Sequence, residues 1–215
     1  GLTELVKKNI KSQNLNFSNS INELPFSPDA IFIAVGTPSD ADSKADLSYI
    51  FTAVNEIAKS IKKYTVIVTK STVPIGTNEK IKEILGGSVQ EALFDVASNP
   101  EFLREGCAIK DFLYGDRVVI GAENEKAMDV LSKIYEPISQ NGSIILKTSI
   151  VSAEIIKYSS NAFLATKISF INEMSDLCQK VGGNIYDVAH GMGLDKRIGN
   201  QFLNAGPGFG GSCFP

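Results

Sequence analysis

The stretch Ala30-Ile31-Phe32-Ile33-Ala34-Val35-Gly36-Thr37-Pro38 joins a continuous apolar run to a short polar turn. A run of this kind is typical of a strand that is buried on both faces of a parallel sheet. The pattern recurs, because a helical stretch at 47–62 leads to a second β-branched run at 64–69, which again ends in a polar turn. This alternation predicts an α/β fold in which helices cover a parallel sheet.

The remaining elements divide the chain into two parts. We expect a helix within 1–11, a short strand at 15–18, helices at 78–85 and 124–135, and strands at 93–98, 117–120 and 144–146. Over 150–181 neither proline nor glycine occurs and apolar residues recur every three or four positions, which predicts one long helix. A helix capped by Asn184 follows at 184–192. We therefore predict a sheet domain at 1–148 and an all-helical domain at 149–215.

The composition excludes several classes of function. Of the 215 residues, 43% are apolar and 21% are charged, and the net charge of −3 gives no reason to expect a nucleic acid or a membrane surface as a partner. No apolar run approaches the length of a membrane span. Three cysteines are too few and too odd in number for a disulfide framework, which favours a reducing compartment and a cytoplasmic location. The single histidine, His190, excludes chemistry built on a histidine cluster, and we expect no metal site.

Polar turns follow three successive strands of the predicted sheet. They are Thr37-Pro38, the turn at 71–74, and the turn at 99–106 that carries Glu101 and Glu105. Open α/β sheets bind ligands beyond the carboxyl ends of their parallel strands, so the three turns together predict a binding site. Taken singly, each turn is equally explained as a solvated loop.

The long helix carries a candidate catalytic pair. Lys157 and Asn161 are four residues apart and therefore project from one face, with Glu154 three residues before Lys157. A lysine in a mostly apolar helix can act as an acid or base, or can hold developing negative charge. The simpler alternative is a solvated lysine on the outer face. Arg197 is either a phosphate partner or a surface arginine.

The glycine-dense segment at 206–214 surrounds Cys213. Its glycines formally match G-x-G-x-x-G, but no strand precedes them and no helix or acidic residue follows, so a dinucleotide fingerprint is rejected. Glycines let backbone amides approach a ligand closely. Cys213 is therefore either a reactive thiol or a structural one, whereas Cys107 and Cys178 are expected to be structural.

Five sequence blocks in order carry a family resemblance: Val35-Gly36-Thr37-Pro38, Lys70-Ser71-Thr72-Val73-Pro74, the segment 98–106, the segment 154–163, and the segment 208–215. Together they resemble the UDP-glucose/GDP-mannose dehydrogenase family along essentially the whole chain. The resemblance implies a truncated Rossmann-like NAD domain followed by a helical middle domain. It also implies NAD-dependent oxidation of UDP-glucose to UDP-glucuronate in two hydride transfers, within nucleotide-sugar and polysaccharide biosynthesis.

The resemblance implies a role for each catalytic candidate. Cys213 would trap the sugar aldehyde as a thiohemiacetal, which a second oxidation converts into a thioester for hydrolysis. Lys157 and Asn161 would handle the C6 oxygen and its developing charge. Thr72 and Glu101 would orient a water or act as the general base, and the sequence leaves open which of them is the base.

The resemblance also implies the binding residues and the partner. It places NAD against Thr37, Pro38, Ser71, Thr72 and Glu105. The residues that it assigns to the UDP-sugar are Glu101, Phe102, Leu103, Arg104, Glu105, Lys157, Asn161, Arg197, Phe202, Asn204, Gly206, Gly208, Phe209 and Gly210. Arg197 would reach the substrate of a neighbouring subunit, and a homodimer would form through the long helix at 150–181.

The chain departs from the family's pattern at both ends. It lacks the opening strand–GxGxxG–helix unit and the further nucleotide-sugar domain, so we interpret it as an internal part of such an enzyme and expect the isolated chain to be inactive. Asn204 stands where some members carry lysine, which removes a charged phosphate contact. The alternatives are an inert dimerising fragment, or an enzyme whose substrate is GDP-mannose or a UDP-N-acetylhexosamine.

Overall fold

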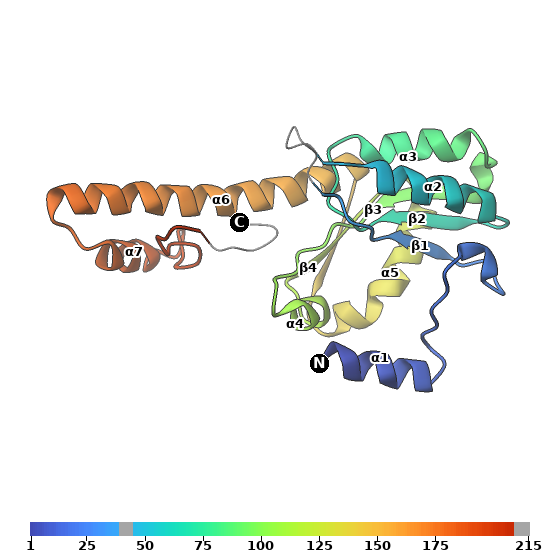
Figure 1. Cartoon of the computed structure of the whole chain (residues 1–215), viewed down its shortest axis with the longest axis horizontal. Coiled ribbons are helices and arrows are strands. Elements are labelled where there is room, and N and C mark those ends of the chain that lie inside the picture. Colours follow the sequence, from blue (N-terminus) through green and yellow to red (C-terminus); the bar gives the residue numbers. More distant parts are fainter. Residues whose placement is uncertain (39–44, 209–215) are drawn as a thin grey trace. The chain divides into compact units, whose positions relative to one another are not determined.

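The computed structural model describes residues 1–38 and 45–208 and divides the chain into two compact units, Gly1–Lys157 and Tyr158–Pro215 (Figure 1). The first unit holds one five-stranded sheet with the strand order β1-β2-β3-β4-β5. Its strands are β1 (Ala30–Ile33), β2 (Thr65–Thr69), β3 (Phe94–Ser98), β4 (Arg117–Ala122) and β5 (Ile144–Thr148). All five lie where the apolar runs predict strands.

One pairing differs from the parallel sheet expected from the sequence. β1, β2 and β3 are parallel to one another, and β4 is parallel to β5, but β3 and β4 are antiparallel. The physical reason lies in the connection from β3 to β4, which contains only the six-residue helix α4 (Ala108–Leu113). A parallel pairing needs a crossover connection that covers one face of the sheet. Here the segment after β3 reverses direction, and β4 runs antiparallel beside β3.

Helices cover both faces of the sheet and bury its apolar side chains. α2 (Ser48–Ser60) and α3 (Thr77–Gly86) pack on one face, where Ile67 of β2 is buried. α5 (Glu125–Gln140) packs on the other face, against Val66 and Val68 of the same strand (Figure 1). Because successive side chains of a strand point to opposite faces, this alternation produces two separate apolar cores and a Rossmann-like α/β layer arrangement.

The shorter elements of the first unit include one error of prediction. α1 (Leu2–Lys11) confirms the helix expected at the start, and the 3-10 turns Ile21–Glu23 and Glu91–Leu93 were not predicted. The strand expected at 15–18 is wrong, because no strand in the described part of the chain pairs with this segment and Phe17 is exposed.

The long helix α6 (Ile150–Val181) has the predicted bounds, and its first residues, 150–157, belong to the sheet unit. In the second unit it is followed by α7 (Ile185–Gly193), where Asn184 Oδ1 accepts from the Tyr186 N–H at 2.9 Å and caps the helix as predicted. No helix within the described ranges, 1–38 and 45–208, has the length and apolar character needed to cross a membrane.

Candidate active site

The polar turns after the first strands lie together. Ser71 Oγ donates to Val35 O at 2.6 Å, and Thr37 Oγ1 donates to Thr72 O at 3.1 Å. The third turn begins at Asn99, whose N–H also bonds to the end of β2. Since β1, β2 and β3 are parallel, their carboxyl ends share one edge of the sheet, and the predicted grouping of the three turns is confirmed.

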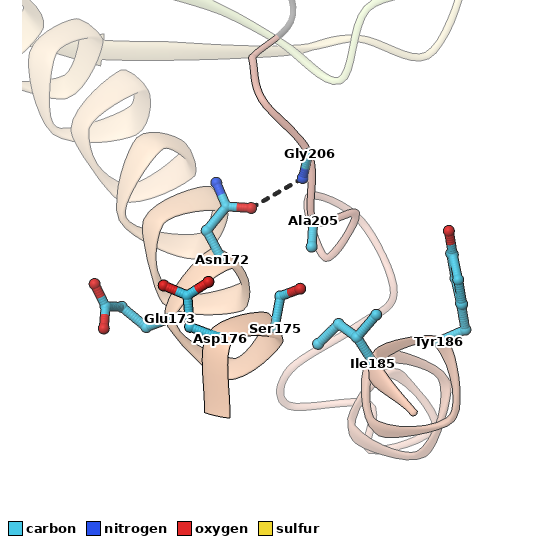
Figure 2. A pocket seen from close by; sticks show the side chains of 8 residues that line it. All are labelled: Asn172, Glu173, Ser175, Asp176, Ile185, Tyr186, Ala205 and Gly206. Carbon is cyan, nitrogen blue, oxygen red and sulfur yellow. Dashed lines mark hydrogen bonds between the residues drawn. The ribbon is translucent and has the colours of Figure 1, made fainter. Parts of the chain in front are cut away.

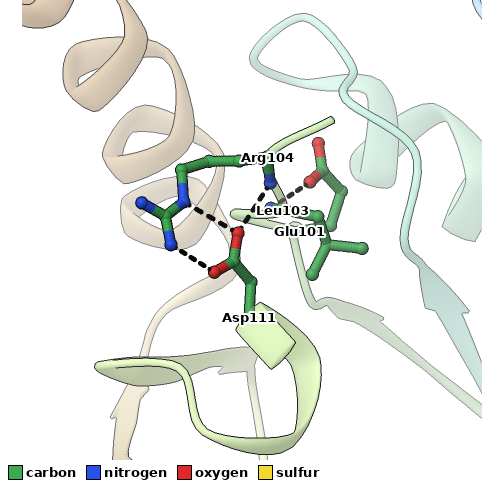
Figure 3. Close-up of polar contacts among 4 residues, drawn as sticks. All are labelled: Glu101, Leu103, Arg104 and Asp111. Carbon is green, nitrogen blue, oxygen red and sulfur yellow. Dashed lines mark hydrogen bonds and ion pairs between the residues drawn. The ribbon is translucent and has the colours of Figure 1, made fainter. Parts of the chain in front are cut away.

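The third turn and the long helix meet at an ion pair. Lys157 Nζ lies 3.0 Å from Glu101 Oε1. The other carboxylate oxygen of Glu101 accepts the Leu103 N–H at 2.6 Å (Figure 3). Lys157 is only 6% exposed. The alternative of a solvated lysine on the outer face is therefore wrong, and a buried cation is paired with a carboxylate at the edge where ligands of α/β sheets bind.

The start of α6 is held in place by a buried carboxylate. Glu154 is 3% exposed and accepts three hydrogen bonds, from Gly76 N at 2.9 Å, Asn78 N at 3.2 Å and Asn78 Nδ2 at 2.7 Å. These donors lie at the N-terminus of α3, where a negative charge is favourable. The helix also approaches β4 closely, since a Cβ on Gly121 would lie 2.6 Å from the Ala153 Cβ. Both contacts fix the turn that carries Lys157.

A second lysine, the half-buried Lys70, lies near this pair and was missed by the sequence reasoning. Lys70 Nζ donates to Asn99 Oδ1 at 3.0 Å, and Tyr135 Oη donates to the same oxygen. Burial lowers the pKa of Lys70 to about 8; Glu101 acts in the opposite direction and Lys157 adds to the lowering. The sequence contains a feature that could have identified this lysine, because Lys70 is the first residue of the motif Lys70-Ser71-Thr72-Val73-Pro74, which follows a buried strand.

Two other residues of the third turn, Arg104 and Phe102, have side-chain contacts of their own. Arg104 donates two hydrogen bonds to Asp111, at 2.9 Å and 2.6 Å, and its guanidinium remains largely exposed (Figure 3). The ring of Phe102 has Arg117 Cζ 4.0 Å and Lys157 Nζ 5.5 Å from its centroid. Phe102 thus packs against the catalytic lysine candidate. Leu103 and Glu105 are exposed on the same turn.

The substrate-binding candidates of the second unit lie on α6 and on the loops after α7. Asn161 follows Lys157 by one helical turn and is half-buried. Arg197 is exposed and pairs with Asp195 at 2.6 Å. The backbone of Phe202 has a φ of 64° and Asn204 is exposed, whereas Gly208 has a φ of 126°. Phe209, Gly210 and Cys213 lie outside the described residues.

The same unit contains a polar pocket of 390 Å³ between α6, α7 and the segment 205–206. Gly206 N donates to Asn172 Oδ1 at 2.9 Å across its upper edge (Figure 2). The pocket is lined by Asn172, Glu173, Ser175, Asp176, Ile185, Tyr186, Ala205 and Gly206. Of the predicted substrate contacts, this pocket includes Gly206.

The described cysteines differ in their surroundings. Cys178 is buried on α6, as expected of a structural thiol. Cys107 is exposed just before α4, so the expectation that it packs as a structural thiol is wrong. His190 is exposed in the last turn of α7.

Comparison with known proteins places both parts of the chain in one family. Residues 1–139 match the NAD binding domain of the UDP-glucose/GDP-mannose dehydrogenase family, and residues 151–215 match the central domain of that family. The sheet unit is therefore part of an NAD-binding domain.

Relatives with curated names agree with this match. The chain is 54% identical over 216 residues to a UDP-glucose 6-dehydrogenase of Bacillus subtilis, covering 100% of this chain and 48% of the relative. It is 51% identical over 218 residues to a UDP-glucose 6-dehydrogenase of Rhizobium meliloti, covering 100% of this chain and 50% of the relative. The chain thus spans about half the length of the curated relatives that it matches.

Solved structures show the same relationship. A UDP-glucose dehydrogenase from Pyrobaculum islandicum superimposes with a TM-score of 0.92 at 43% identity, covering 99% of this chain and 50% of that chain. A GDP-mannose dehydrogenase from Pseudomonas aeruginosa gives a TM-score of 0.82 at 31% identity, with 99% and 50% coverage. From the matched domains and these relatives, the chain belongs to the UDP-glucose/GDP-mannose dehydrogenase family.

Proposed function

We propose that the protein carrying this chain is a UDP-glucose 6-dehydrogenase, which oxidises the C6 alcohol of UDP-glucose to a carboxylate. The observation that carries the proposal is the ion pair between the buried Lys157 and the half-buried Glu101 at the carboxyl edge of the NAD-binding sheet. A cation and a carboxylate side by side suit a reaction in which an alcohol loses a proton and its oxygen gains negative charge. The names of the curated relatives support this choice of substrate.

The turns after β1 and β2 fit a dinucleotide. Thr37 and Ser71 are fixed by hydrogen bonds to neighbouring backbone, and Pro38 is exposed beside them. Small polar residues at this edge leave room for a cofactor at the place where open α/β sheets bind nucleotides. We assign Thr37, Pro38, Ser71, Thr72 and Glu105 to NAD. When bound, NAD accepts the hydride in both oxidation steps.

The residues of the chain divide the reaction between them. The Lys157 ammonium faces the C6 oxygen and, with Asn161, stabilises its negative charge, while Glu101 or Thr72 accepts the proton or orients water. The Cys213 thiolate then adds to the aldehyde carbon and forms a thiohemiacetal, whose oxidation leaves a thioester. Water cleaves the thioester, and the products are the carboxylate and the free thiol.

We assign the UDP-sugar by analogy with the family. The assigned residues are the turn from Glu101 to Glu105, Lys157 and Asn161, and, further along the chain, Arg197, Phe202, Asn204, Gly206, Gly208, Phe209 and Gly210. We also propose that the domain boundary lies between residues 148 and 149. Because glycine has no side chain, backbone amides of a glycine-rich segment can approach phosphate oxygens closely.

We further propose a homodimer formed through α6, in the cytoplasm. The helix exposes several large apolar side chains, including Phe163, which is 65% exposed, and Phe170, Leu177 and Val181. Apolar side chains that recur along one helix are typical of an interface with a partner, and an equal helix of a second copy would cover them.

The alternative substrates are GDP-mannose and UDP-N-acetylhexosamines. The structural similarity to a GDP-mannose dehydrogenase keeps the first of these open, although the identity to that protein is 31%, against 43% to the UDP-glucose dehydrogenase of Pyrobaculum islandicum. A substrate panel with the full-length protein decides between them. We expect NADH formation with UDP-glucose at a kcat/KM well above that with GDP-mannose or UDP-N-acetylglucosamine; a preference for either of the latter would overturn the assignment.

A further inference from the structure

We propose that Lys70 is a positioning residue of the active site: its ammonium, bound to Asn99 at the start of the turn that carries Glu101, places a second positive charge near the Glu101–Lys157 ion pair. The inference deepens the proposed function and rests on it for the role of Glu101 and Lys157. Its structural basis is independent of the substrate, since it depends only on the contacts of the Lys70 side chain.

The backbone around Lys70 is fixed by the sheet. Lys70 directly follows β2, and its N–H donates to Ile33 O of β1 at 2.9 Å. Its side chain crosses toward the end of β3, where Nζ donates to Asn99 Oδ1 at 3.0 Å. Asn99 opens the turn that carries Glu101, so Lys70 reaches the active-site turn from the neighbouring strand.

Asn99 holds Lys70 in a fixed position. The Asn99 side chain is fully buried, and its Nδ2 donates to Val119 O of β4 at 2.7 Å. Its Oδ1 accepts from both Lys70 and the hydroxyl of Tyr135, which comes from α5. The ring of Tyr135 also lies 5.6 Å from Lys70 Nζ, at the distance of a cation–π contact. A lysine with this many fixed contacts is not a solvated surface charge.

The charges that act on Lys70 come from two other elements. Glu101 on the turn after β3 favours the ammonium form, and Lys157 on α6 disfavours it. Together with burial, which has the largest effect, they leave the pKa of Lys70 at about 8. Asn99 and Tyr135 are neutral neighbours at that pH, because burial raises the pKa of Tyr135 to about 12.

The coupling is reciprocal, because an ammonium that is stabilised by a carboxylate stabilises that carboxylate equally. Below about pH 8, the site therefore holds two ammonium groups and one carboxylate, which is one positive charge more than above this pH. An extra positive charge beside the Lys157 ammonium stabilises the negative oxygen that develops at C6. Deprotonation of Lys70 removes this charge, so kcat/KM is expected to fall as the pH rises through about 8.

The test compares the full-length wild-type protein with Lys70→Met and Lys70→Arg. For Lys70→Met we expect kcat/KM at pH 7 to fall by about tenfold or more, and the alkaline limb near pH 8 to disappear. Lys70→Arg keeps a charge at every accessible pH, so its profile should lack the limb while its activity at pH 7 exceeds that of Lys70→Met. The inference is overturned if kcat/KM of Lys70→Met still decreases near pH 8 as in the wild type. It is also overturned if the substitution lowers kcat/KM by the same factor at every pH.

A second readout does not depend on turnover. The lysine side chains labelled with ¹³C at Cε give an NMR signal whose midpoint reports the pKa of each lysine. We expect one signal with a midpoint near pH 8 that is absent from Lys70→Met and moves to lower pH in Glu101→Gln, because Glu101 favours the charged form. The coupling is contradicted if no lysine signal has a midpoint near pH 8, or if the midpoint does not change in Glu101→Gln. If Lys70 of the wild-type protein titrates as expected but the protein does not oxidise UDP-glucose, the proposed function is refuted. The coupling of Lys70 to Glu101 and Lys157 is not refuted by that result.

Discussion

Lys157 Nζ lies 3.0 Å from Glu101 Oε1, and this ion pair joins the first turns of α6 to the turn after β3. The lysine side chain is 7% exposed, and a charge at such a site is favourable only while its partner is present. The pair brings together two residues that are 56 positions apart in the chain. The assignment of the active site depends on this contact.

Replacing the lysine tests the chemical role of the pair. We expect Lys157→Met in the full-length protein to lower kcat by about 10²–10³-fold, because the variant removes the cation that we propose stabilises the developing negative charge. Steady-state NADH formation with UDP-glucose measures the effect. Lys180→Met is the matched control, since Lys180 is an exposed lysine in the last turn of the same helix. Equal activity of the two variants contradicts the role given to Lys157.

The anchor of α6 predicts a loss of stability. Glu154→Ala removes the acceptor of three hydrogen bonds and leaves the donors at the start of α3 buried without it. We expect the free energy of unfolding to fall by about 1–3 kcal/mol in urea denaturation. Glu173→Ala, on an exposed position of the same helix, should change it by less than about 0.5 kcal/mol. A Glu154→Ala variant as stable as the wild type would show that the contact contributes nothing.

The low pKa of Lys70 predicts a pH dependence of stability. Between about pH 8 and its ordinary value of 10.5, the folded protein holds fewer protons on Lys70 than the unfolded chain does. Stability therefore rises with pH in this window through Lys70. Unfolding measured at pH 8 and pH 10 should show a smaller rise for Lys70→Met than for the wild type. The same rise in both proteins would place the Lys70 pKa at its ordinary value.

The thiols give a test of the nucleophile. We expect Cys213 in the full-length protein to be alkylated much faster than Cys107 or Cys178, and UDP-glucose to protect it, because a catalytic cysteine reacts as its thiolate. Peptide mass mapping after a short exposure to iodoacetamide measures the three rates. Cys107 is the informative comparison because it is exposed, whereas Cys178 is buried. If Cys107 reacts as fast as Cys213, or if UDP-glucose protects neither, the assignment of the nucleophile is wrong.

The exposed apolar residues of α6 predict an interface. Phe163→Glu places a charge where the proposed dimer buries an aromatic ring, and we expect the dimer to dissociate at micromolar concentration. Sedimentation of the full-length protein measures the mass. Lys180→Glu also changes the charge of the helix and serves as the control. A dimer that survives Phe163→Glu unchanged would locate the interface elsewhere.

Local patterns in the sequence predict most of the elements but not how they pair. The apolar runs at β1 and β2 indicate strands, and the absence of glycine and proline over 150–181 indicates a helix. These patterns are informative because the local conformation of the chain depends on neighbouring residues. The direction of β4 is not encoded in Arg117–Ala122, because an apolar run looks the same in either direction. Its antiparallel pairing depends on how the preceding segment turns back.

The same limit applies to the candidate site. The grouping of Thr37, Ser71 and Glu101 follows from a general rule about the carboxyl ends of parallel strands. The burial of Lys157 depends on contacts of Glu154 with residues far away in the chain, which spacing along one helix does not reveal. Lys70 was overlooked because a lysine after a strand looks like a solvated residue until Asn99 and Tyr135 are placed around it.

The number of NADH molecules formed for each UDP-glucose consumed tests the central claim most directly. A dehydrogenase that carries the C6 alcohol through to the carboxylate transfers two hydrides, so the full-length protein should form two NADH for each UDP-glucuronate released. The measurement follows absorbance to completion with limiting UDP-glucose and excess NAD, and identifies the product by mass. One NADH with release of the aldehyde, or no NADH at all, would contradict the account.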